Sequence, residues 1–149
     1  MLYFGFMKYF FLFVCCLLSA VYCYSQFPDC DIWLLNMQES GGKFLFSKPV
    51  NITDRAGYDN QPVFSPDGKY IFFSSQRDST AKQTDIYKYH IKTQITTQFT
   101  NTPTSEYSPA FMPDRKNISV VMVEKDSAQR LWKFPLDAGD PGLITDVDS

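Results

Sequence analysis

Short runs of aromatic and β-branched residues, each bounded by turn-forming residues, make up the chain beyond residue 30. Residues 70–75 (YIFFSS) and 118–123 (ISVVMV) show the pattern clearly. Such residues suit pleated, half-buried strands, whereas the Pro, Asp, Asn and Gly residues between the runs favour turns. No segment after residue 25 keeps apolar residues at helical spacing for three turns. The pattern therefore predicts an all-β protein of short strands.

Three sequence anchors recur in the same order along the chain. The first is an aromatic strand, the second an apolar-Thr-Asp or Phe-Thr-Asn ending, and the third a strand that runs into a Pro-Asp turn. The aromatic strand occupies residues 31–35, 85–89 and 130–134, the ending 52–54, 99–101 and 144–146, and the turn segment 62–69 and 109–116. The aromatic strands begin 54 and then 45 residues apart, and the turn segments 47 apart. Because the order is kept each time, the anchors indicate an internal repeat.

Each repeat contains four short strands. Strand one ends at Phe64 or Phe111, a Pro-Asp turn leads into strand two, and the aromatic and apolar-Thr segments are strands three and four. Four strands in about 45 residues is the period of a β-propeller blade. We therefore predict an all-β fold of propeller blades with four antiparallel strands each: a half blade at 31–54 and blades at 55–101 and 102–146. The alternative is chance recurrence of short strands in a β-sandwich.

The first repeat resembles the TolB-type, WD40-like β-propeller repeat family. The mark of that family is a Ser-Pro-Asp-Gly turn, a Ser-x-Arg-Asp-like loop and an Asp-Ile-Tyr-like strand. This chain has Ser65-Pro66-Asp67-Gly68, residues 75–78 (SQRD) and Asp85-Ile86-Tyr87. The second repeat keeps Pro113, Asp114 and Trp132 at the corresponding positions. There Arg115 replaces the turn glycine, so we expect the second turn to be strained or to take another form.

The resemblance implies an exported propeller that binds a protein or peptide in the periplasm or at the cell surface. It implies no catalytic residue and no cofactor. Some members of the family are fused to peptidases, so the alternative is the propeller portion of a prolyl-oligopeptidase-type serine peptidase. The hydrolase domain of such an enzyme carries a Gly-x-Ser-x-Gly motif, which this chain lacks. A third hypothesis is a non-functional product of a broken gene.

The amino terminus has the pattern of a secretory signal peptide at 1–25. Lys8 precedes an apolar run at 10–21, and small or polar residues follow it. We expect a signal-peptide helix, cleavage after Ser25 and a periplasmic or secreted protein, with membrane contact only through an uncleaved signal segment. A membrane anchor is the alternative, but a spanning helix needs about 20 apolar residues. No small residue precedes a cysteine here as a lipobox requires.

The repeat count predicts an incomplete ring. The chain holds about two and a half blades, whereas propellers usually close with four to eight. Exposed blade faces and strand edges favour aggregation. We therefore interpret the sequence as the amino-terminal part of a longer propeller. The alternative is an assembly of several copies into one ring.

Charge and composition exclude some functions. The formal net charge is −2 and no basic run occurs, so nucleic-acid binding has no electrostatic support. After cleavage Cys30 is the only cysteine, which excludes an intramolecular disulfide. With one histidine, His90, a zinc site is not supported. No metal and no cofactor are expected.

The sequence also supports expectations for a few individual residues. We expect His90 at the surface, at a strand end, and Asp67 and Asp114 bonded to turn amides. The equivalent aromatic residues of the three repeats, Trp33, Tyr87 and Trp132, are expected to pack between blades. The alternatives are a calcium site from Asp78, Asp85 and Asp126 and glycosylation at residues 78–80 and 126–128, which resemble the short O-glycosylation motif of Bacteroidetes.

Overall fold

The computed structural model describes residues 28–77 and 83–144. This part of the chain forms twelve strands and contains no helix, so no helix there is long or apolar enough to cross a membrane. The strands are β1 (Trp33–Leu34), β2 (Met37–Ser40), β3 (Lys43–Phe46), β4 (Val50–Asn51), β5 (Asp59–Phe64), β6 (Tyr70–Ser75), β7 (Asp85–His90), β8 (Ile95–Gln98), β9 (Glu106–Phe111), β10 (Asn117–Val123), β11 (Gln129–Pro135) and β12 (Gly142–Leu143). The expected all-β class is confirmed.

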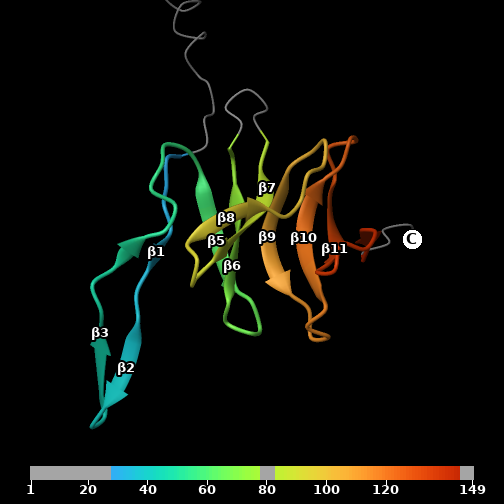
Figure 1. The fold of residues 1–149 in the computed structure, drawn as a ribbon. Coiled ribbons are helices and arrows are strands. Elements are labelled where there is room, and N and C mark those ends of the chain that lie inside the picture. Colours follow the sequence, from blue (N-terminus) through green and yellow to red (C-terminus); the bar gives the residue numbers. More distant parts are fainter. Residues whose placement is uncertain (1–27, 78–82, 145–149) are drawn as a thin grey trace, which may run out of the picture.

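Two antiparallel four-stranded sheets stand side by side (Figure 1). The first sheet has the order β5-β6-β7-β8 and the second the order β9-β10-β11-β12, so strands consecutive in sequence are neighbours. In both, strand one pairs with strand two just after the Pro-Asp turn, as in Phe64 with Ile71 and Phe111 with Ile118. The expected four-stranded sheets are therefore present, whereas the boundaries of the repeats stay a prediction.

An amino-terminal hairpin (β1 to β4) precedes the first sheet. The short strands β1 and β4 pair beside the first sheet, and β2 and β3 extend the hairpin beyond its lower end in Figure 1. Gly41 and Gly42 form the tip with φ of 59° and 74°, the left-handed conformation that a two-residue hairpin turn needs. Met37, Phe44 and Phe46 on this extension are all exposed.

The core consists of two layers, one on each face of the first sheet. Ile71 and Phe73 of β6 point toward the amino-terminal hairpin and pack with Ile32. Phe72, on the opposite face of the same strand, packs with Ile118 of the second sheet. Because side chains alternate across a strand, the apolar run in β6 supplies both layers. The first sheet is therefore enclosed on both sides, as a propeller blade is.

Both Pro-Asp turns have the same backbone form. The amide of Gly68 donates to the Ser65 carbonyl at 2.9 Å, and that of Arg115 to the Met112 carbonyl at 2.9 Å. The φ angles are 68° at Gly68 and 58° at Arg115. Of the two expected outcomes for the second turn, strain is the one observed, and a change of form does not occur. Arg115 instead keeps the left-handed conformation that favours glycine.

Each first strand also contains a bulge that the sequence did not reveal. Gln61 and Ser108, 47 residues apart, have φ of 56° and 51° where the register with strand two shifts. The Gln61 side-chain oxygen accepts hydrogen bonds from the Ser74 hydroxyl and the Ser108 amide, both at 2.9 Å. The two bulges are thereby joined across the sheets, and the kink recurs with the repeat.

Several expectations fall outside the described residues or need correction. The signal segment at 1–25, with its predicted helix, and Asp78 lie outside them. Trp33 was expected to pack between blades, but it is 59% exposed. Its counterparts Tyr87 and Trp132 do pack on the preceding layer. The hairpin is the first layer of the described structure, so no sheet stands before Trp33.

Candidate functional site

A groove opens between the first and second sheets at the end where the Pro-Asp turns lie. Its apolar lining comes from Tyr70, Phe72, Phe99, Phe111 and Leu136, and its other lining residues are Ser65, Pro66, Asp67, Lys88 and Arg115. We call it the turn groove. Its volume of about 480 Å³ is in the range of small-ligand sites.

Aromatic rings form the wall of the turn groove. Phe72 lies at its base with ring centroids 5.1 Å from Phe99 and 5.2 Å from Phe111, both edge to face. Edge-to-face contacts of this kind hold rings in fixed orientations. Phe72 is buried, whereas Phe99 and Phe111 are half-buried, so the outer rings present apolar surface to a ligand.

Two cations border this aromatic wall. The Lys88 ammonium lies 5.7 Å from the ring centre of Tyr70 and 5.8 Å from that of Phe99. Arg115 is exposed on the second turn. Neither Lys88 nor Arg115 has an ion-pair partner among residues 28–77 and 83–144.

The acid of the groove is already engaged. Asp67 accepts a 2.6 Å hydrogen bond from the Ser65 hydroxyl and one from the Lys69 amide, and the Lys69 ammonium lies 3.4 Å away. These bonds, the Ser65 hydroxyl first, lower the pKa of Asp67. Its charge therefore stabilises the turn and leaves the two cations uncompensated.

Two neighbouring carboxyl groups, the buried Glu106 and the half-buried Asp85, lie between the sheets at the opposite end. Glu106, fully buried at the start of β9, accepts hydrogen bonds from Thr100 at 2.8 Å and from Thr102. Burial, with the nearby charge of Asp85 as a smaller contribution, raises the pKa of Glu106 to about 7. Burial also raises the pKa of Asp85, which accepts a bond from Gln98 at 3.1 Å.

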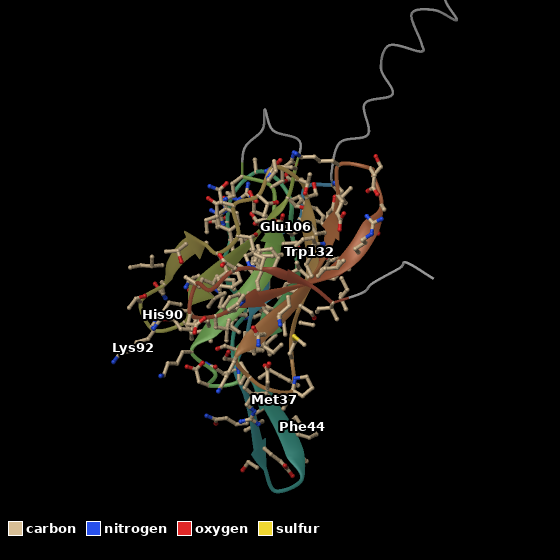
Figure 2. All side chains as sticks on the ribbon, turned by 90° about the vertical axis from the view of Figure 1, so that its right-hand side faces the viewer. Met37, Phe44, His90, Lys92, Glu106 and Trp132 are labelled. Carbon is tan, nitrogen blue, oxygen red and sulfur yellow. The ribbon has the colours of Figure 1, made fainter. Side chains whose placement is uncertain are left out.

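A second groove, of about 460 Å³, lies near this carboxyl pair. Trp132 lines it and donates its indole N–H to Glu124 at 2.9 Å, and Arg130 pairs with Glu124 at 2.9 Å and with Asp126 at 3.0 Å. Figure 2 shows Glu106 and Trp132 far from Met37 and Phe44 of the hairpin. Arg130, Glu124 and Asp126 are thus paired with one another, unlike Lys88 and Arg115 of the turn groove, which have no ion-pair partner among the described residues.

Known proteins were compared with this chain. No family model matches it. Its sequence is similar to dipeptidyl-peptidase 5 of Porphyromonas gingivalis, with 31% identity over 127 residues. That match covers 82% of this chain and 17% of the peptidase, so the chain spans less than a fifth of that relative.

Solved structures give the fold. TolB from Acinetobacter baumannii superposes with a TM-score of 0.58 at 19% identity, over 74% of this chain and 29% of that one. A protein described as TolB from Agrobacterium tumefaciens superposes with a TM-score of 0.59 at 17% identity, over 83% and 51%. The chain has a TolB-like propeller fold. The resemblance seen in the Ser-Pro-Asp-Gly turn is therefore shown at the level of the fold.

The predicted signature residues lie in several parts of the fold, and those of the Pro-Asp turns are near the turn groove. Ser65, Pro66 and Asp67 border the turn groove, with Gly68 in the same turn. In the second turn, Asp114 accepts from the amides of Lys116 and Asn117, as Asp67 does from Lys69, which confirms the expected bonding of both acids. Pro113 precedes Asp114 on that exposed turn. That these residues are the signature of the repeat stays a prediction.

The aromatic-strand residues lie away from the turns. Ile86 is fully buried, and its amide donates to the Thr100 hydroxyl at 2.8 Å. The amide of Ile32 donates in the same way to Thr53 at 3.0 Å, which explains the recurring Thr of strand four. The guanidinium of Arg77 lies over the ring of Tyr87, with its central carbon 4.9 Å from the ring centre.

Two further expectations concern chemistry. His90 is half-buried at the end of β7, where its Nδ1 accepts from the Thr93 amide at 3.0 Å, so its strand-end place is confirmed and it orders the β7–β8 turn. In the part of the chain that the structure describes, no three His, Cys, Asp or Glu side chains are grouped to hold a metal.

Sequence reasoning missed Lys88, Phe99 and Glu106. Each belongs to a different strand or loop, and only the packing of two sheets brings them to one interface. The one available signal for Glu106 was its position 47 residues after Asp59, at the same point of the repeat.

Proposed function

We propose that this chain is a non-catalytic propeller module that binds a protein or peptide segment in the cell envelope. The observation that carries the proposal is the turn groove, where half-buried aromatic rings stand beside cations with no ion-pair partner among the described residues. Rigid aromatic rings give a large contact area at little cost in conformational entropy. A few polar groups on an apolar wall are typical of specific binding sites.

The cell-envelope location is part of the proposal. It rests on the signal-peptide pattern at 1–25, with export and cleavage after Ser25. The proposal also makes the chain the amino-terminal part of a longer TolB-like protein. The exposed Trp33 and Val50 support this, because a further sheet of a ring would cover them.

A peptide-binding titration tests the proposal. A fluorescent pool of short peptides of mixed sequence is added to the 149-residue chain and binding is followed by anisotropy. We expect saturable binding that Phe99→Ala weakens at least tenfold, because the ring forms groove wall. Ile95→Ala, an exposed apolar change on β8 outside the groove, serves as the matched control. Urea unfolding of each variant verifies that it is folded. Absence of saturable binding to the wild-type chain would overturn the proposal.

A second candidate function follows from the sequence similarity to dipeptidyl-peptidase 5. On this view the chain is the propeller portion of a prolyl-oligopeptidase-type serine peptidase. The test is to read the adjoining coding sequence for a Gly-x-Ser-x-Gly motif and to assay the whole gene product on dipeptidyl p-nitroanilides. Hydrolysis blocked by a serine-directed reagent would favour this candidate over the non-catalytic module.

A further inference from the structure

We infer that the turn groove recognises the free carboxyl terminus of a peptide whose last side chain is apolar or aromatic. The inference rests on the proposed peptide-binding function and names the ligand class of the same groove. Three observations carry it: Lys88 has no ion-pair partner among the described residues, Arg115 is strained, and aromatic rings line the same groove.

Lys88 differs from its counterpart in the second sheet in what covers it. Its counterpart 45 residues later is Lys133 in β11. Trp132 and Phe134 pack toward the first sheet, so Lys133, which lies between them, points to the opposite face of the second sheet. Lys88 lies on the corresponding face of the first sheet, but there the second sheet covers it, and its ammonium lies beside Tyr70 and Phe99 in the turn groove.

Charge complementarity indicates the sign of the ligand's charge. The protein as a whole is acidic, with a formal net charge of −2, yet the turn groove contains two cations. Among the described residues that line it, the one carboxylate is that of Asp67, which is bonded to Ser65 and Lys69. An ammonium held partly out of water gains more from an anion than an exposed one does. The groove therefore favours an anionic group on its ligand.

Arg115 adds geometry to this charge. It holds φ at 58°, where the first turn has Gly68 at 68°. A non-glycine residue in this conformation costs free energy, and such strain gathers at functional positions. Arginine presents a planar pair of N–H donors that match the two oxygens of a carboxylate. The turn thus carries a carboxylate-binding side chain at a position that favours glycine.

The aromatic wall favours an apolar side chain next to the carboxylate of the ligand. Phe99 and Phe111 are half-buried rings beside the cations. An apolar side chain next to the carboxylate would cover them and displace water from them. A peptide carboxyl terminus places both groups on a single residue, whereas an internal Asp or Glu is flanked by peptide groups on both sides.

The test compares three fluorescein-labelled peptides on the 149-residue chain by anisotropy. The first is a Gly-Ser hexapeptide ending in Phe as the free acid, the second is its carboxyl-terminal amide, and the third is an amidated peptide with an internal Asp before Phe. We expect the free acid to bind at least about tenfold more tightly than the other two, as for charge-assisted hydrogen bonds. Equal binding of the amide or of the Asp peptide would overturn the inference.

Variants of the two cations sharpen the test. Lys88→Met and Arg115→Gly should each weaken binding of the free acid about tenfold and reduce its preference over the amide. Arg115→Gly restores the glycine of the first turn, so its midpoint of thermal unfolding should not fall, which separates lost binding from lost folding. Lys133→Met, at the same repeat position outside the groove, should bind like wild type.

Failure of this inference can be told apart from failure of the proposed function. If the peptides bind without a preference for the free acid, or if Lys133→Met weakens binding as much as Lys88→Met, the groove still binds peptides but not by their carboxyl terminus. If neither these peptides nor the mixed pool shows saturable binding, both the inference and the proposed function are overturned.

Discussion

Asp59 and Glu106 occupy the same position in successive sheets, 47 residues apart, and both carboxyl groups are buried. Their surroundings are opposite. Arg55 pairs with Asp59 at 3.0 Å and Arg77 approaches it at 3.8 Å. At the Glu106 position the counterpart of Arg55 is Thr102, and Asp85 lies nearby as a second acid. One repeat position therefore holds a compensated charge in the first sheet and a carboxyl that favours its proton in the second.

Stability should fall as pH rises through the range in which Glu106 ionises. Its folded-state pKa, about 7, lies above the ordinary value of 4.5, so the folded state binds the proton more tightly than the unfolded state. That stabilisation is fully present below about pH 4.5 and is lost as pH rises through about 7. The free energy of urea unfolding should drop by roughly 1–3 kcal/mol between about pH 5 and pH 8.

Glu106→Gln isolates this effect, because the amide cannot ionise. The variant should keep its stability over the same pH range apart from the contributions of other groups, so its curve should be flatter than that of wild type. A wild-type curve that does not fall, or a Gln variant that falls equally, would show that Glu106 is not the group responsible.

Asp59→Asn should be destabilising at neutral pH, because it leaves Arg55 and Arg77 without their shared buried carboxylate. Both guanidinium groups are partly exposed, with side-chain exposure of 22% and 30%, so water offsets part of the loss. We expect a decrease of about 2–3 kcal/mol in the free energy of unfolding. Asp54→Asn, an exposed acid close by in sequence, is the control and should change it by less than about 0.5 kcal/mol.

The strands could be predicted well from the sequence because turn-forming residues that are close together in sequence define the repeat. The Pro-Asp turns act within one sheet, so the position of β6 and the pairing of strands one and two followed from residues close together in sequence.

The turn groove and the carboxyl pair could not be predicted in the same way. Lys88, Phe99 and Arg115 come from two sheets, and their proximity depends on how one sheet packs on the next. The exposure of Trp33 shows the same limit, because a repeat position fixes which face a residue is on but not whether another sheet covers that face.

Thr100→Val should destabilise the first sheet and its interface with the second sheet. The Thr100 hydroxyl accepts the Ile86 amide at 2.8 Å and donates to Glu106 at 2.8 Å, so valine, of similar shape, leaves two buried groups without this partner. We expect a loss of about 2 kcal/mol in urea unfolding. Thr97→Val on the exposed strand β8 controls for β-propensity and should be near neutral. If both variants lose the same amount, the hydroxyl network is not the cause.

The two turns allow a reciprocal test of backbone strain. Arg115→Gly should stabilise the chain by about 0.5–1 kcal/mol, because glycine adopts φ of 58° without the penalty of a Cβ atom. Gly68→Ala should cost about 1 kcal/mol, although a Cβ atom there would meet no neighbour within 4 Å, so conformation alone is responsible. Lys116→Gly, next to Arg115 but with no positive φ, should destabilise through the added freedom of the unfolded chain. Urea unfolding of the three variants gives the signs, and a destabilised Arg115→Gly would mean that side-chain contacts of Arg115 outweigh its strain.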